Sequence, residues 1–83
     1  MSALSRDEIR TMMAEVLQAQ GKPMPEDDAA NLETIGFRSL DFSELALRVE
    51  DEIGDELNFD APELRQIATI SDVLDFLEQL QAA

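Results

Sequence analysis

The hydroxyl of Ser39 is the group on this chain to which chemistry is most easily attached. Gly36 marks a loop before it and an amphipathic acidic segment follows, in the run Ile35-Gly36-Phe37-Arg38-Ser39-Leu40-Asp41-Phe42-Ser43-Glu44-Leu45. A serine at the start of a helix can cap it, accepting a hydrogen bond from a backbone N–H. It can also carry a group, because such a hydroxyl is exposed and the helix dipole favours an attached phosphate. A lone serine favours capping, so its neighbours must decide.

Composition excludes most other chemistry. The chain has neither cysteine nor histidine, which excludes a disulfide framework, thiolate or histidine zinc sites, and cysteine- or histidine-based catalysis. Carboxylates for acid–base work need a pocket and contrasting environments, whereas the acidic residues here form runs expected on exposed faces: Asp27-Asp28, Glu50-Asp51-Glu52 and Asp55-Glu56. The spacing around Gly54 does not fit a calcium loop. We therefore expect no catalytic and no metal-ligating residue.

Size and charge favour one small domain that binds proteins. We expect a single domain over residues 1–83. The 19 acidic and 6 basic residues give a net charge of −13, which argues against nucleic acid or an anionic membrane as partner and favours basic protein surfaces. No apolar run is long enough to span a membrane and no signal peptide opens the chain, so the expected location is the cytoplasm. The hydrophobic fraction of 45% is too high for a disordered acidic tail.

The apolar periodicity predicts an all-α fold, a small four-helix bundle with three longer helices and a short third helix. The first helix is expected from about Arg6 to Gln20, with a capping box of Ser5 and Glu8. A long loop, 22–38, separates it from the second, which runs from Ser39 or Leu40 to about Ile53. Asp60 and Glu63 bracket the short third helix, and Thr69 and Asp72 cap the fourth. Met24, Leu32 and Ile35 should tie the long loop to the core.

The second helix has two distinct faces. Its core-facing stripe consists of Phe42, Leu45, Ala46, Val49 and Ile53. Leu40 and Leu47 lie nearly opposite this stripe, seven residues apart. Acidic side chains frame them, and two outward leucines in such a frame indicate a docking surface rather than scattered exposure. The predicted docking residues are Leu40, Asp41, Glu44, Leu47, Glu50 and Asp51.

The run Gly36-Phe37-Arg38-Ser39-Leu40 resembles the phosphopantetheine attachment site of acyl carrier proteins, in which a Gly-x-Asp-Ser-Leu run precedes an acidic helix. Arginine stands here in the usual aspartate place. The resemblance extends over roughly residues 5 to 80, since acyl carrier proteins are bundles with a long first loop and a short third helix. Peptidyl carrier proteins share the architecture but usually have two glycines before the serine motif, so the acyl branch fits better.

The resemblance implies that Ser39 carries a covalent 4'-phosphopantetheine arm, placed there by a phosphopantetheinyl transferase. Acyl intermediates of fatty acid, polyketide or related specialised biosynthesis would then be held as thioesters, by a monomer that is not itself an enzyme. The implied partners are acyl-loading, condensing or tailoring enzymes with basic docking surfaces. Arg38 is placed to contact the arm's phosphate, and Phe37 to narrow the entrance of a cleft for the acyl chain. The cleft between the second and third helices would be lined by Val49, Leu57, Leu64 and Ile67.

A different class of function also fits the composition: a non-catalytic acidic helical adaptor in which Ser39 is only a helix cap. It leaves the glycine–serine placement and the outward leucines as coincidences. A mimic of nucleic acid charge would need acidic residues at phosphate-like spacing, which the chain does not show.

Overall fold

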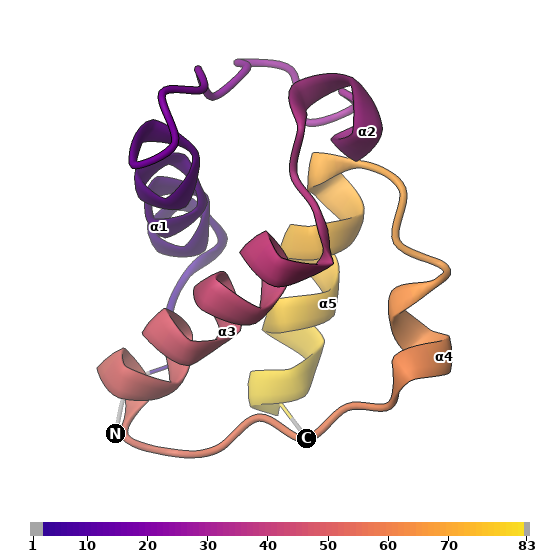
Figure 1. The fold of residues 1–83 in the computed structure, drawn as a ribbon. Coiled ribbons are helices and arrows are strands. Elements are labelled where there is room, and N and C mark those ends of the chain that lie inside the picture. Colours follow the sequence, from indigo (N-terminus) through magenta and orange to yellow (C-terminus); the bar gives the residue numbers. More distant parts are fainter. Residues whose placement is uncertain (1–2, 83) are drawn as a thin grey trace.

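The structure is a computed structural model and describes residues 3–82, which form five helical segments and one isolated backbone bridge between Asn31 and Thr69. The three long helices cross one another and the two short ones lie at the side of the bundle (Figure 1). Within residues 3–82 no helix is long and apolar enough to cross a membrane. The predicted all-α bundle is confirmed, with one helix more than expected. The helices are α1 (Arg6–Gln18), α2 (Leu32–Ile35), α3 (Ser39–Ile53), α4 (Ala61–Leu64) and α5 (Ile70–Ala82).

Helix α1 begins at the predicted capping box and ends two residues before the predicted end. The Ser5 hydroxyl accepts from the Glu8 N–H at 3.2 Å, and the Glu8 carboxylate accepts from the Ser5 N–H at 3.0 Å. After Gln18 the chain tightens, because the N–H groups of Gln20 and Gly21 donate to carbonyls three residues earlier. Gly21 then takes a left-handed conformation with φ of 74°, which ends the helix.

Helix α2 interrupts the segment that the sequence predicts as a loop without helices. The side chain of Asn31 caps it, accepting from the Glu33 N–H at 2.9 Å, and Gly36 ends it with a left-handed φ of 76°. Both are ordinary helix boundary residues. The prediction missed α2 because a single turn is too short to show a period of apolar residues.

The long segment before Ser39 is fixed to the start of α5 by backbone hydrogen bonds. The Leu32 N–H donates to the Ala68 carbonyl at 2.9 Å, and the Ser71 N–H donates to the Asp28 carbonyl at 2.8 Å. Met24, Leu32 and Ile35 pack partly buried against the core, as predicted. The segment thus reaches Ser39 along a path determined by α5.

Thr69 and Asp72 cap α5 as predicted. The Thr69 hydroxyl accepts from the Asp72 N–H at 3.2 Å. The Asp72 carboxylate accepts from the N–H groups of Ala68 and Thr69 at 2.9 and 3.0 Å, and these bonds hold the pKa of this carboxyl below its usual value. The turn that joins α4 to α5 is thereby closed beside Leu64 and Ile67.

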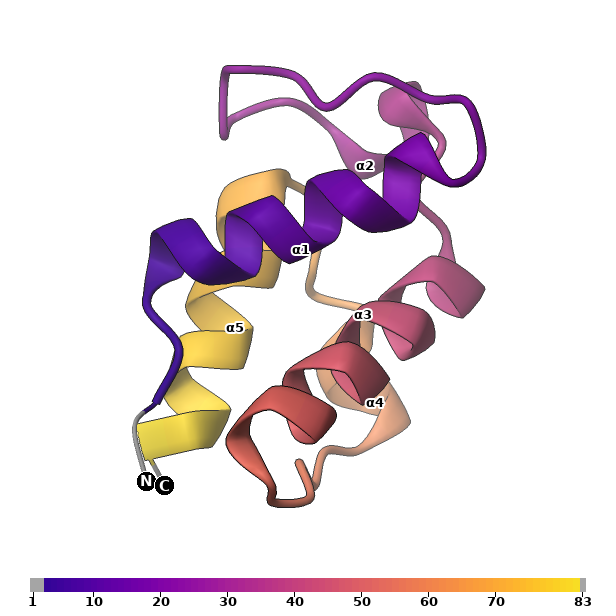
Figure 2. The same ribbon diagram turned by 90° about the vertical axis from the view of Figure 1, so that its left-hand side faces the viewer.

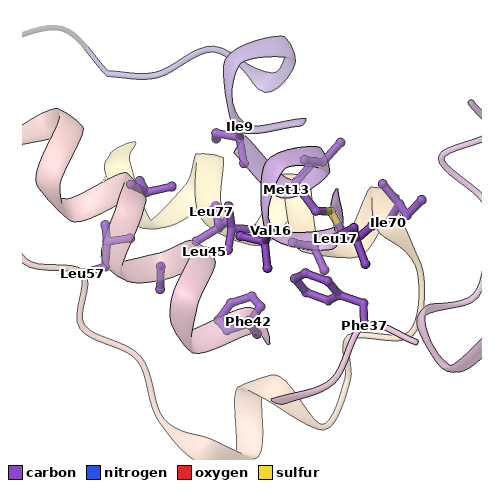
Figure 3. Close-up of a cluster of buried hydrophobic side chains, with 14 residues drawn as sticks. Ile9, Met13, Val16, Leu17, Phe37, Phe42, Leu45, Leu57, Ile70 and Leu77 are labelled. Atoms are coloured by element: carbon purple, nitrogen blue, oxygen red, sulfur yellow. The ribbon is translucent and has the colours of Figure 1, made fainter. Parts of the chain in front are cut away.

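The core lies where α1 packs across α3 and α5 (Figure 2). Helix α3 contributes its predicted stripe, with Phe42, Leu45, Ala46 and Val49 buried and Ile53 half-buried. Figure 3 shows Phe42 and Leu45 of α3 beside Val16 and Leu17 of α1 and Leu77 of α5. The buried residues of the other elements are Ile9, Met13, Val16, Leu17, Phe37, Leu57, Ile70, Val73, Leu74 and Leu77.

Candidate functional site

Ser39 is the first residue of α3 and is not its cap. Arg38 holds the N-cap position, with an extended backbone at φ −107° and ψ 178°. The Ser39 side chain is exposed, and within residues 3–82 its hydroxyl has no hydrogen-bond partner. A capping serine would be the N-cap residue and would accept an N–H of the first turn. Ser39 does neither, so its hydroxyl is free to react.

Asp41 provides the cap that Ser39 does not. One carboxylate oxygen accepts from the Arg38 N–H at 2.8 Å, and the other accepts from the side-chain amide of Gln20. Asp41 is only 8% exposed. The prediction that Asp41 belongs to the docking surface is therefore wrong, because both carboxylate oxygens are engaged inside the protein.

The loop that precedes Ser39 is held in place by residues of the turn after α1. The Lys22 ammonium donates to the Gly36 carbonyl at 2.8 Å and to the Gln20 side chain at 3.0 Å. A β-carbon at Gly36 would meet the Lys22 side chain at 3.0–3.3 Å, and the left-handed backbone there also favours glycine. Gln20 and Lys22 were not predicted as site residues, because only the fold brings them to this loop.

The guanidinium of Arg38 has no internal partner in the described part of the chain. Arg6, Arg10 and Arg48 each form an ion pair with a carboxylate, whereas Arg38 is exposed and forms none. An unpaired guanidinium next to an exposed hydroxyl can donate two hydrogen bonds to a phosphate attached there.

A pocket of about 640 Å³ opens beside Ser39. Leu64 and Ile67 line it, as predicted. Val49 and Leu57 do not, because both are buried in the core. Phe37, placed by prediction at the entrance, forms part of the wall and is itself buried. The lining residues are Asn31, Leu32, Glu33, Gly36, Phe37, Arg38, Ser39, Phe42, Leu64, Ile67 and Ala68.

The outward face of α3 carries the two leucines that the helical wheel places there. Leu40 is 83% exposed and Leu47 is 58% exposed, and they are the large hydrophobic side chains found exposed in residues 3–82. Asp51 and Glu44 are also exposed, and Glu44 pairs with Arg48 at 3.3 Å. The carboxylate of Glu50 is partly engaged, because it accepts from the Leu57 N–H at 2.8 Å.

Comparison with known families decides what this arrangement is. The family described as the phosphopantetheine attachment site matches residues 7–77. The chain belongs to the phosphopantetheine attachment family. Phosphopantetheine is accordingly the cofactor of its family, as the resemblance implied.

Two proteins that resemble this phosphopantetheine attachment domain are both acyl carrier proteins. An acyl carrier protein of Phaeodactylum tricornutum is 44% identical over 45 residues, which are 54% of this chain and 57% of that relative. The crystal structure of an acyl carrier protein from Thermotoga maritima superposes with a TM-score of 0.70 and 23% identity, covering 93% of this chain and 91% of that one. The structural likeness confirms the fold.

The residues of the attachment domain that the sequence did not reveal come from outside the serine motif. Asn31, Leu32 and Glu33 reach the pocket through α2, and Ala68 reaches it through the turn before α5. Asn31 five residues before Gly36 is a helix-boundary signal that could have located α2. No local sequence pattern indicates that these residues lie close to Ser39.

Proposed function

We propose that this chain is an acyl carrier protein that holds acyl intermediates as thioesters on a 4'-phosphopantetheine arm attached to Ser39. It presents them to enzymes of fatty acid, polyketide or related specialised biosynthesis. The free, exposed hydroxyl at the first residue of α3 is the observation that carries the proposal. The cytoplasmic location, the monomeric state and the single domain over residues 1–83 remain predictions.

The residues at the start of α3 fit the group. In the transferase, Ser39 Oγ would attack the pantetheine-bearing phosphorus of coenzyme A. The new P–O bond would replace the pyrophosphate P–O bond, adenosine 3',5'-bisphosphate would leave, and the serine proton would pass to a base of the transferase. The α3 N-terminus and the Arg38 guanidinium favour the negative charge of the resulting phosphodiester. The arm supplies a terminal thiol for thioester chemistry, which the chain lacks because it has no cysteine. The protein's part is to attach, position and present, not to catalyse.

Partner enzymes would dock on the outward face of α3. Leu40 and Leu47 supply apolar contact beside the attachment residue, and Glu44 and Asp51 supply exposed negative charge. A basic rim on the enzyme complements this charge and accelerates encounter. Transferases and acyl-loading, condensing or tailoring enzymes share the need to reach Ser39, so one face can serve them all.

Intact mass after incubation with coenzyme A and a promiscuous phosphopantetheinyl transferase tests the function. We expect the mass to rise by one phosphopantetheine group and the new thiol to accept an acyl group. An adaptor without a carrier role would gain no mass. The adaptor hypothesis also required Ser39 to act as the cap, and the structure assigns that place to Arg38 and Asp41.

The exposed carboxylates should govern the rate of loading. Changing Glu44 and Asp51 to lysine should slow loading about tenfold at low salt and make it less sensitive to salt, because exposed charges act mainly on encounter. These rates are obtained by quenching the reaction at timed intervals, at several salt concentrations, and measuring the intact mass. As a control, Glu26→Lys with Asp27→Lys alters the net charge equally in an exposed part of the long loop. Equal slowing by both pairs would show that net charge, not the α3 face, attracts the enzyme.

Arg38 should affect both the transferase and the arm. Arg38→Asp should load several-fold faster with a generic transferase, because it restores negative charge at the edge of the docking face, and should leave the arm's phosphate more mobile by phosphorus NMR. Arg65→Asp is the matched control, since Arg65 is also exposed and forms no ion pair in the described residues but does not line the pocket. Unchanged rates and an unchanged phosphate signal in Arg38→Asp would remove Arg38 from the site.

A further inference from the structure

Phe42 forms part of the pocket wall and is held by two further aromatic rings. Its ring centroid lies 5.6 Å from that of Phe59 in an edge-to-face contact and 5.9 Å from that of Phe76. Phe59 and Phe76 also contact each other, at 5.9 Å in an edge-to-face arrangement. These three residues are called the aromatic cluster. Each ring contacts both others, so none can turn aside alone without losing two such contacts.

The aromatic cluster lies where the pocket ends. Phe42 lines the pocket, whereas Phe59 and Phe76, which pack against its ring, do not. Val49 is two turns further along α3, about 10 Å from Phe42 along the axis, and is fully buried. In Figure 3 Leu57 lies at the opposite end of the core from Phe37, with Phe42 between them. Val49 and Leu57 are thus both buried in the core, and neither lines the pocket.

The pocket is lined by both polar and apolar residues. Asn31, Glu33 and Arg38 contribute polar groups beside Ser39, where the amide-rich arm would enter. The apolar lining consists of Leu32, Phe37, Phe42, Leu64, Ile67 and Ala68. A group carried on the arm would meet this apolar lining, of which Phe42 is a part.

We propose that the aromatic cluster closes the inner end of this pocket and restricts the sheltered acyl groups to short chains. The inference rests on the proposed function, since it concerns the group carried on the Ser39 arm. A longer chain would have to separate the three rings to reach the space near Val49 and Leu57, or leave its outer methylene groups in water. Only methylene groups that enter the protein add to the stability of the loaded form.

Thermal unfolding of loaded proteins measures this limit. A promiscuous transferase can attach butanoyl- or dodecanoyl-phosphopantetheine from the corresponding acyl-coenzyme A, and intact mass verifies the loading. In the unchanged chain we expect the two loaded forms to unfold at the same temperature to within about 1 °C. Burying even one additional methylene group would raise the midpoint by about 3–6 °C in a domain of this size. A dodecanoyl form whose unfolding midpoint lies about 3–6 °C above that of the butanoyl form would overturn the proposal.

Opening the cluster should lengthen the accepted chain. Phe59→Ala and Phe76→Ala each remove a half-buried ring that does not line the pocket, and in each variant the dodecanoyl form should unfold at least about 3 °C above the butanoyl form. Leu80→Ala controls for general loosening, since Leu80 is also half-buried against the core and lies outside the pocket and the cluster. It should show no dependence on chain length.

Failure of this inference and failure of the proposed function give different results. If Ser39 takes up no arm, the mass does not change and the proposed function is wrong. If the arm attaches but neither cluster variant distinguishes the two chain lengths, the cluster is not the barrier. Should both variants prove too unstable to load, the comparison of the two chain lengths in the unchanged protein still decides.

Discussion

Ser39→Ala is expected to abolish attachment of the phosphopantetheine arm and to leave the fold unchanged. Within the glycine–serine motif, Ser39 is the residue that presents a free hydroxyl in the first turn of α3. Because the structure assigns the cap to Asp41 rather than to Ser39, the substitution should change the free energy of unfolding by no more than about 0.5 kcal/mol. Intact mass after transferase treatment and urea unfolding followed by circular dichroism give the two results.

Ser43→Ala is the matched control for this experiment. Ser43 is an exposed serine on the same helix, one turn further on, so its loss should leave loading unaffected. An alanine variant at Ser39 that still gains the arm would move the attachment site elsewhere. Loss of loading together with loss of helical signal would show that Ser39 has a structural role that its exposure does not indicate.

Leu45→Ala is expected to cause the largest loss of stability, whereas Leu47→Ala should cause almost no loss. Leu45 is fully buried on the core face of α3, whereas Leu47 is 58% exposed on the opposite face. Truncating a buried leucine costs about 2–5 kcal/mol, enough to lower the midpoint of an 83-residue domain by at least about 8 °C. Leu47→Ala should stay within about 0.5 kcal/mol of the unchanged protein.

Leu47→Ala should instead weaken docking. Because the proposed apolar contact of Leu47 with the transferase would be lost, we expect the KM for loading to rise while the unfolding midpoint stays the same. The chain has neither tryptophan nor tyrosine, so circular dichroism is the suitable probe of unfolding. Similar losses of stability for Leu45→Ala and Leu47→Ala would mean that both side chains are buried, and the docking face would then have to be placed elsewhere.

Local hydrogen bonds and periodicity in the sequence predicted most of the helical framework. The Ser5–Glu8 box begins α1, Gly54 ends α3 with a left-handed φ of 70°, and Thr69 with Asp72 begins α5. The opposite faces of α3 follow from 3.6 residues per turn. Ser39, Leu40 and Leu47 were therefore placed correctly without any tertiary information, because residues within one or two turns determine their positions.

Interactions between distant residues decided the rest of the site. From the sequence, Asp41 looks like another acidic residue on the outward face of α3. In the structure, the side chain of Gln20, in the turn after α1, contacts Asp41, which is buried. Glu50 likewise accepts from the backbone of Leu57, beyond the end of its helix. Periodicity cannot predict these contacts, since it gives the face of a side chain but not the element that approaches that face.

The pocket shows most clearly which features the sequence determines and which depend on the tertiary structure. By itself the sequence determined an all-α framework, a serine at the start of α3 and two leucines facing outward. The tertiary structure alone decided that α2 and the turn before α5 form the wall beside Ser39, and that the rings of Phe59 and Phe76 pack against Phe42 in that wall. The physical reason is range: helix starts, ends and faces depend on neighbours a few residues away, whereas a cavity is the space left between side chains from segments far apart in the chain.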